Sequence, residues 1–125
     1  MIKEKISACK APAEISAYSN AIKCGNMIFV SGQLPVNPET GQKPKTIADQ
    51  TRQVIENIRN ILADAGATLD NVVKTTVYLQ EMYLFSQMNE VYVEAFKEPY
   101  PARTSMAVKE LPQAALVSLD VVAVL

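Results

Sequence analysis

The sequence predicts an α+β fold in which a mixed β-sheet carries two helices packed on one face. Strand-like stretches are interrupted by only two amphipathic helical stretches, in the order βββαβαββ. The chain has 125 residues, 49% of them hydrophobic, which is enough to bury one core and leaves little room for a second. We therefore expect residues 1–125 to form a single domain.

The first three strands are predicted near the N-terminus. Residues 2–8 alternate between apolar and polar side chains, which is the period of a strand. Residues 21–32 read as two strands joined by Gly25-Asn26, a pair typical of a tight hairpin turn. Residues 34–45 are rich in turn-forming residues and are expected to form a loop.

The first helix is predicted over residues 46–65. Thr46 can cap its N-terminus, Asp49 suits its first turn, and Gly66 suits a C-terminal cap. One face of this helix carries an apolar stripe that is expected to face the core. The stripe consists of Ile47, Thr51, Val54, Ile55, Ile58, Ile61, Leu62 and Ala65.

A fourth strand and a second helix follow. Residues 71–80 predict the strand, with Val73, Thr75, Val77 and Leu79 on one face. Residues 84–97 predict the helix, which lacks a clean N-cap and should be stopped by Pro99. Its inward face is expected to hold Phe85, Met88, Val91, Tyr92, Ala95 and Phe96.

The last two strands are predicted over residues 103–108 and 114–125, joined by a turn around Pro112. The final strand is apolar on both sides, and such strands are normally buried on both faces. Two helices can cover only one face, so another subunit is expected to cover the other. The sequence therefore predicts a homo-oligomer whose sites can lie at subunit boundaries.

Composition excludes several classes of function. Twelve basic residues balance thirteen acidic ones, which gives no basic excess for nucleic-acid binding. The absence of histidine removes Ser-His-Asp and Cys-His catalysis and nearly all zinc sites. No signal peptide, membrane span or glycine-rich phosphate motif is recognisable, so a cytoplasmic protein is expected. Cys9 and Cys24 can be neighbours on paired strands, but two reduced, buried thiols are the favoured interpretation.

Arg103 is the first candidate site residue. A guanidinium presents a planar fork of donors that matches a carboxylate, and Pro101 restricts the backbone before it. The alternative is an arginine that lies at a sheet edge in solvent or pairs with a distant glutamate. Spacing alone favours the alternative.

Other polar residues have similar double interpretations. Ser31 and Gly32 can line a pocket, since glycine allows close backbone approach, or can simply end a strand. Tyr18 can donate a hydrogen bond or cap the core, and Asn89 can be a solvated helix residue or a ligand. Ser118 and Asp120 share one face of the last strand. A buried carboxylate at Asp120 would need a partner such as Arg103 or a lysine.

Four stretches together resemble the reactive intermediate deaminase family, also called the YjgF/YER057c/UK114 family. They are "MIFVSGQLPVNPETG", "QTRQVIENIRNILADAG", "VVKTTVYL" and "PYPARTSMAV", and the match is collinear from about residue 8 to the C-terminus. The resemblance implies a chorismate-mutase-like fold and a homotrimer with sites in clefts between subunits. It also implies hydrolysis of enamine and imine intermediates to 2-keto acids and ammonia, without a cofactor.

The resemblance assigns a role to each candidate residue. It makes Arg103 the residue that holds the substrate carboxylate, and it makes Tyr18, Ser31, Gly32 and Asn89 pocket residues. Ser105 occupies a position usually held by cysteine, whose backbone groups help to orient substrate and water.

The last strand departs from the family pattern. Ser118 stands where many deaminating members carry a glutamate that helps to activate water, and Asp120 aligns with a second glutamate. Losing a positioned acid or base can lower a rate by about two to four powers of ten. A non-catalytic or specialised trimer that binds small carboxylates is therefore an alternative. An RNA-cleaving function, suggested by an older family label, is disfavoured by the charge balance and the absence of histidine.

Overall fold

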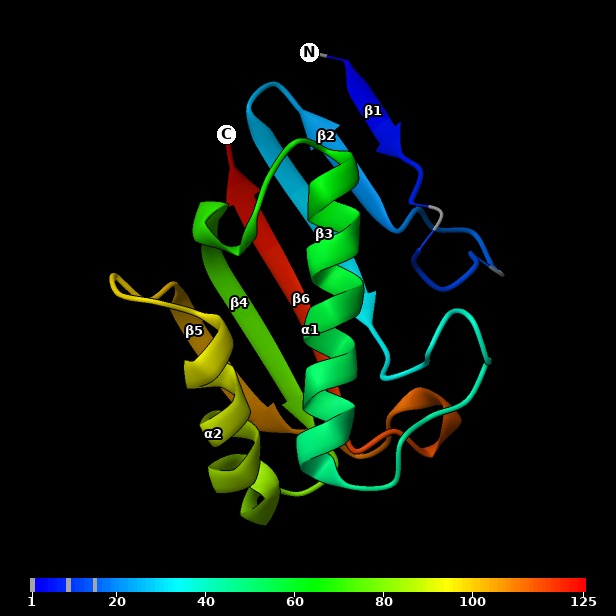
Figure 1. Ribbon diagram of the computed structural model, residues 1–125, viewed down its shortest axis with the longest axis vertical. Helices are drawn as coiled ribbons and strands as arrows, with labels where there is room; N and C mark the ends of the chain where they lie inside the picture. Colours follow the sequence, from blue (N-terminus) through cyan, green and yellow to red (C-terminus); the bar gives the residue numbers. More distant parts are fainter. Residues whose placement is uncertain (1, 9, 15) are drawn as a thin grey trace.

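The computed structural model describes residues 2–8, 10–14 and 16–125, and within them it contains one six-stranded sheet and two α-helices (Figure 1). The strands are β1 (Lys3–Ile6), β2 (Ala21–Cys24), β3 (Met27–Gln33), β4 (Val72–Leu79), β5 (Ala102–Ala107) and β6 (Val117–Val124). The helices are α1 (Ile47–Asp64) and α2 (Phe85–Ala95), and short 3-10 helices η1 (Leu69–Asn71), η2 (Met82–Leu84) and η3 (Pro112–Ala114) lie in the connections.

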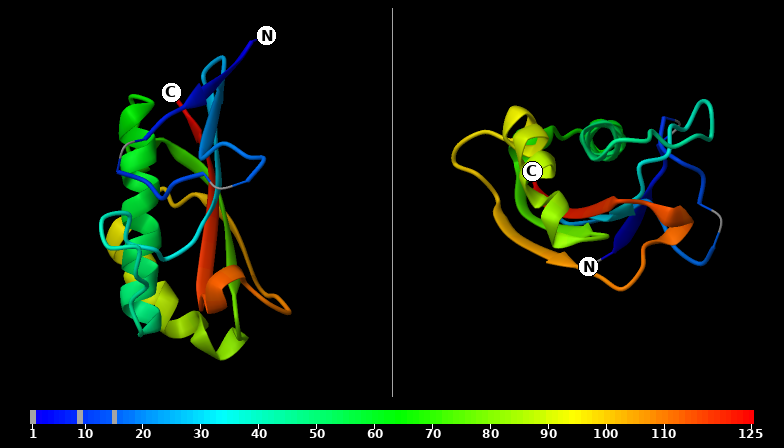
Figure 2. Two further views of the ribbon diagram at one scale, coloured as in Figure 1. Left: turned by 90° about the vertical axis from the view of Figure 1, so that its right-hand side faces the viewer. Right: turned by 90° about the horizontal axis from the view of Figure 1, so that it is seen from below.

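The sheet has the strand order β1-β2-β3-β6-β4-β5, so the last strand of the chain lies at its centre. Neighbouring strands are antiparallel except for β4 and β5, which are parallel. Both helices pack on the same face of the sheet (Figure 2). The predicted α+β fold and its βββαβαββ order are thus confirmed.

The first helix forms as its sequence predicts. The Thr46 hydroxyl accepts a hydrogen bond of 3.1 Å from the backbone N–H of Asp49, which satisfies one free donor at the helix start. Gly66 follows the helix with φ +80°, a conformation that other residues rarely adopt. The predicted stripe is buried from Ile47 to Leu62 and half-buried at Ala65.

The face of the sheet predicted for one side chain of β4 is wrong. The sequence predicts that Val73 shares a face with Thr75, Val77 and Leu79. Val73 is 49% exposed, however, whereas those three residues and Val72 are buried. The register of β4 against β6 shifts between Val72 and Lys74, which marks a bulge. The extra residue of a bulge reverses the side-chain alternation, and Thr75, Val77 and Leu79 resume the buried face.

The second helix is shorter than its pattern. It ends at Ala95, four residues before Pro99, because Phe96 takes up an extended conformation with φ −98° and ψ 140°. This turn of the chain places the Phe96 side chain in the core, where it is 1% exposed. Pro99 therefore does not set the helix end.

The sheet face opposite the helices keeps exposed apolar side chains. Met27, Phe29 and Met106 point to this face and are 39%, 42% and 37% exposed. Val122 and Val124 of β6 lie on the same face and are half-buried. Among the residues described, neither helix contributes to covering them (Figure 2). We call this surface the open face.

Candidate active site

Arg103 lies on the edge strand β5 and points toward α2. Its guanidinium donates a hydrogen bond of 2.7 Å from Nη1 to Oδ1 of Asn89. Its Cζ atom lies 5.1 Å from the ring centroid of Phe85 and 4.6 Å from that of Tyr92. Among residues 2–8, 10–14 and 16–125, no carboxylate forms a salt bridge with it. The sequence left open that Arg103 pairs with a distant glutamate, and the described residues do not form such a pair.

The Tyr92 ring is held in place from two further sides. Its hydroxyl shares a hydrogen bond of 2.8 Å with the Thr75 hydroxyl, and its ring lies 4.5 Å from that of Phe96. Burial raises the pKa of Tyr92, although the bond to Thr75 and the charge of Arg103 act in the other direction. Tyr92 therefore stays a neutral aromatic surface for the guanidinium at physiological pH.

Ser105 shares the helix-side face of β5 with Arg103, since the two positions pair with Val77 and Thr75 of β4. Its Oγ atom is buried and has no hydrogen-bond partner among the residues described. A buried hydroxyl without a partner is unusual in a native protein. Ser105 thus offers a free donor and acceptor two residues from Arg103.

Ser31 and Gly32 form the second part of the predicted site, at the end of β3. The Ser31 hydroxyl donates a hydrogen bond of 2.6 Å to the Ser19 carbonyl, and its backbone N–H donates one of 2.9 Å to the Asn20 carbonyl. Gln33 is buried and donates to the Ser31 carbonyl at 3.2 Å. These bonds fix the backbone on both sides of exposed Gly32. Tyr18 precedes this segment and is 44% exposed.

Ser118 lies beside Gly32. A Cβ atom added to Gly32 would come within 3.3 Å of the Ser118 hydroxyl oxygen, so the glycine keeps this space narrow but open. Ser118 is 6% exposed and stands opposite Tyr78 in the β4–β6 pairing. The position at which the family resemblance expects a glutamate therefore does adjoin a predicted pocket residue.

Asp120 has a different partner from the one suggested by the sequence. Its carboxylate accepts a hydrogen bond of 2.9 Å from the Tyr78 hydroxyl, and neither Arg103 nor a lysine pairs with it in the described chain. This hydrogen bond to the carboxylate raises the pKa of Tyr78, and burial adds to the effect. Asp120 lies on the open face together with Ser118.

Within one chain these residues form two separate groups. We call Asn89, Arg103 and Ser105 the arginine group, and Tyr18, Ser31, Gly32 and Ser118 the glycine group. Arg103 and Ser118 point to opposite faces of the sheet, two strands and three residues apart by register. At about 4.8 Å between strands and about 3.3 Å along them, their Cα atoms are about 14 Å apart. A single chain therefore does not place Ser118 against a ligand held by Arg103.

Sequence reasoning missed the aromatic partners of Arg103. It assigned Phe85 and Tyr92 to the core, because an amphipathic pattern does not show what an apolar ring faces. The available signal was the spacing of Phe85, Asn89 and Tyr92, which puts an amide between two rings on one helix face. Cys9 lies outside the described residues, and Cys24 is half-buried.

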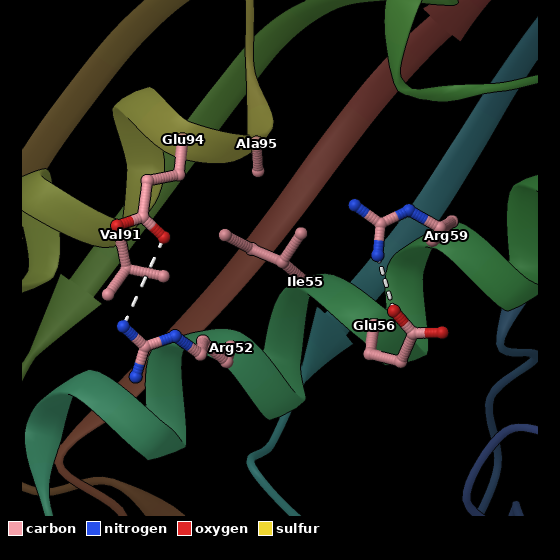
Figure 3. A pocket seen from close by; sticks show the side chains of 7 residues that line it. All are labelled: Arg52, Ile55, Glu56, Arg59, Val91, Glu94 and Ala95. Carbon is pink, nitrogen blue, oxygen red and sulfur yellow. Dashed lines mark hydrogen bonds and ion pairs between the residues drawn. The ribbon is translucent and has the colours of Figure 1, made fainter.

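A groove between α1 and α2 has a volume of about 290 Å³ but contains no candidate residue (Figure 3). Its two arginines are paired with acids, Arg52 with Asp49 at 3.0 Å and with Glu94 at 4.0 Å, and Arg59 with Glu56. In the described part of the chain, no group of three potential metal ligands occurs, and no helix is long and apolar enough to cross a membrane.

Comparison with known proteins gives a consistent result. A family model described as endoribonuclease L-PSP matches residues 8–125. A RutC family protein of Pyrococcus abyssi is 52% identical over 124 residues, which are 98% of each chain. The chloroplastic Reactive Intermediate Deaminase A of Arabidopsis thaliana is 42% identical over 98% of this chain and 66% of its own length.

Solved structures share the fold. A protein of unknown function of the conserved Rid family from Yersinia pestis superimposes with a TM-score of 0.96 at 40% identity. The superposition covers 99% of this chain and 100% of the other. The likeness therefore spans the sheet, both helices and all the connections between them.

Proposed function

The chain belongs to the endoribonuclease L-PSP family, and from that premise we propose that it hydrolyses reactive 2-enamine and 2-imine acids to 2-keto acids and ammonia. The observation that carries the proposal is Arg103, an exposed guanidinium oriented by α2 and free of any described carboxylate. A relative of this chain in Arabidopsis thaliana is named a reactive intermediate deaminase, which supports the same reaction class.

The proposed chemistry requires few groups. Arg103 binds the substrate carboxylate through two parallel N–H donors, which orients the adjacent imine carbon. The oxygen of a water molecule forms a bond to that carbon, and one proton of the water passes to the imine nitrogen, which gives a carbinolamine. The proton of its hydroxyl then passes to the nitrogen as the C–N bond breaks, so that the carbonyl forms and ammonia leaves. Ser105 stands two residues further along the same face of β5, where its backbone groups would help to orient substrate and water. The reaction itself needs no cofactor.

We further propose a homotrimer whose subunits complete one another's sites. Arg103 and Ser118 lie on opposite faces of one sheet, which supports pairing of the arginine group with the glycine group of a neighbouring subunit. The exposed apolar side chains of the open face support burial against other copies. In this proposal residues 1–125 act as one domain, in the cytoplasm, on small 2-imino and 2-keto acids, with no nucleic acid or membrane as partner.

A second candidate function rests on Ser118. Without an acid at this position the protein can still bind small carboxylates while hydrolysing little, and would then serve as a binding protein for such metabolites. RNA cleavage is not favoured, because the formal net charge is −1 and the chain has no histidine.

The test generates 2-imino acids with an amino-acid oxidase or a dehydratase and follows their decay by semicarbazide trapping. We expect the wild-type protein to speed the decay and Arg103→Ala to lose nearly all of this effect. Arg103→Lys should retain only part of it, because an ammonium cannot form the planar double contact. Arg59→Ala, which removes an exposed arginine on α1, is the matched control.

Three outcomes decide between the candidates. If imine decay is no faster with protein than without it while 2-ketobutyrate still binds, the binding function replaces the deaminase. If neither decay nor binding depends on Arg103, both candidates fail. If RNA cleavage survives stringent purification and disappears in Arg103→Ala, the protein is a ribonuclease despite its charge balance and its lack of histidine.

A further inference from the structure

Three side chains of α2 surround the Arg103 guanidinium. Phe85, Asn89 and Tyr92 follow one another at spacings of four and three residues, so they lie on one face of the helix in successive turns. The Asn89 amide, in the middle, accepts the hydrogen bond of 2.7 Å from Arg103. The rings on either side lie 5.1 Å and 4.6 Å from the guanidinium carbon. The guanidinium carbon therefore lies close to both rings.

The chemistry of these neighbours differs from that of an ordinary ion pair. Aromatic ring faces attract a cation through their quadrupole and supply no hydrogen-bond acceptor in the guanidinium plane. A carboxylate in the same place would occupy the donor fork and neutralise its charge. With one Nη1 donor on Asn89 and two rings within 5.1 Å of its central carbon, the guanidinium keeps its remaining donors and its charge for a ligand.

The Tyr92 side of this arrangement is rigid. The Tyr92 ring contacts Phe96 on another side and its hydroxyl is bonded to Thr75 at 2.8 Å, while Thr75 itself pairs with Arg103 across β4 and β5. Thr75 therefore positions both partners of this contact. It pairs with the Arg103 backbone, and its hydroxyl holds the Tyr92 ring that lies near the Arg103 guanidinium. Phe85 is half-buried, and its ring centroid lies 5.1 Å from the guanidinium carbon.

We propose that Phe85 and Tyr92 are positioning residues that act through Arg103, fixing the plane of its guanidinium so that its donors meet the substrate carboxylate. This rests on the proposed function, in which Arg103 binds that carboxylate. Their contribution appears in substrate binding, because the orientation of the fork is needed as soon as the carboxylate is bound.

The test combines a spectroscopic measurement with a binding measurement on the full chain. Arg52, Arg59 and Arg103 are the three arginines of the sequence, so the Nε–H resonances of a ¹⁵N-labelled sample are few. The Arg103 resonance, identified by its loss in Arg103→Lys, should be shifted upfield by the two rings relative to the other two. Phe85→Leu should move it toward them. Phe85→Leu should also weaken 2-ketobutyrate binding. It should raise the KM for imine hydrolysis about tenfold with kcat little changed, as expected for loss of one ring contact.

Conservative variants and a matched control guard against a simple loss of stability. Phe85→Tyr keeps a ring and should preserve both the shift and the affinity, and Tyr92→Phe should preserve the shift while losing only the bond to Thr75. Val93→Ala, which shortens an exposed side chain on the same helix, should change neither.

Each remaining outcome is decisive. If Phe85→Leu leaves the Arg103 resonance in place, the rings do not orient the guanidinium and the proposal is wrong. If the resonance moves while affinity and KM do not, the rings are structural only. If the wild-type protein neither binds keto acid nor hydrolyses imine but shows the shift, the proposed function fails, and the positioning role fails with it although the ring contacts are real.

Discussion

Ser118 is the candidate residue at which the chain departs from the family pattern for the proposed reaction. It is 6% exposed beside Gly32 and carries a hydroxyl where the family resemblance expects a carboxylate. We expect Ser118→Glu to raise kcat/KM for imine hydrolysis by about tenfold or more, because a positioned acid or base typically contributes 10²–10⁴. In Ser118→Gln the new side chain has nearly the shape of glutamate but cannot act as an acid, so this variant should not raise kcat/KM. Equal gains in both variants would show that side-chain size, and not proton transfer, is responsible.

Gly32 leads to a second prediction at this scale. A methyl group at this position would lie within 3.3 Å of the Ser118 hydroxyl, which can turn away because it is the end of a side chain. We therefore expect Gly32→Ala to change the free energy of unfolding by less than about 1 kcal/mol. The same variant should weaken 2-ketobutyrate binding measured by calorimetry, since it narrows the proposed pocket. Normal binding would place the ligand away from Gly32.

The sequence was more informative about which residues belong to the candidate site than about which of them contact each other. Arg103 and Asn89 were both candidates, and they meet only because the chain reverses between α2 and β5. The Tyr78–Asp120 bond joins residues 42 positions apart and leaves no local signal. Phe85 and Tyr92 have the apolar spacing of core residues, and the pattern is the same whether a ring faces aliphatic side chains or a guanidinium.

Among the elements, α1 also holds the loop that follows β3. Asn57 is fully buried in this helix, and its amide donates to the carbonyls of Leu34 at 3.1 Å and Val36 at 3.0 Å. We expect Asn57→Ala to lower the free energy of unfolding by about 2–4 kcal/mol, because it leaves two backbone acceptors without their partner. Urea denaturation measures this loss. Asn60→Ala, one turn along the same helix, removes only a bond of 3.5 Å at the surface and should be nearly neutral.

The connection between β1 and β2 predicts a dependence of stability on acid. Glu14 bonds to Lys5 at 2.7 Å and accepts the backbone N–H of Asn20 at 2.5 Å, and the Lys5 contact, followed by the Asn20 bond, lowers the pKa of Glu14 below its usual 4.5. The folded state then binds this proton less readily than the unfolded state. Stability from Glu14 is therefore fully present above pH 4.5 and is lost as the pH falls through the lower folded pKa.

Thermal melts over a range of pH test this expectation. Glu14→Gln should melt below the wild type at pH 7, and the gap should close well below pH 4.5. A gap that is constant with pH would mean that the ionised carboxylate contributes nothing to stability.

The boundaries of elements show where a sequence pattern stops being informative. Alternation predicted strand β4 correctly but put Val73 on the same face as Thr75, because a bulge adds one residue without any mark in the sequence. The end of α2 was assigned to Pro99, yet the burial of Phe96 ends the helix earlier. In both cases packing against the rest of the sheet overrides the local signal.

For the molecule as a whole, the open face predicts assembly. Phe29 is 42% exposed there, beside Val122 of the central strand. We expect Phe29→Lys to convert the proposed trimer to monomers in light scattering and to abolish imine hydrolysis, because a charge would have to be buried in the interface. Val93→Lys places the same charge on the helix side at a site of 47% exposure and should leave assembly intact. A wild-type monomer with full activity would contradict the shared-site proposal.

The central position of β6 has a consequence for the order of events in synthesis. Its residues are synthesised after those of the other five strands, yet β3 and β4 are connected within the sheet only through β6. Until it emerges, the nascent chain can form the β1–β2–β3 meander and the two helices, but the two halves of the sheet cannot join. We therefore expect the sheet to close only once β6 has been synthesised, and nascent chains stalled before Val117 to remain sensitive to protease while the released protein becomes resistant.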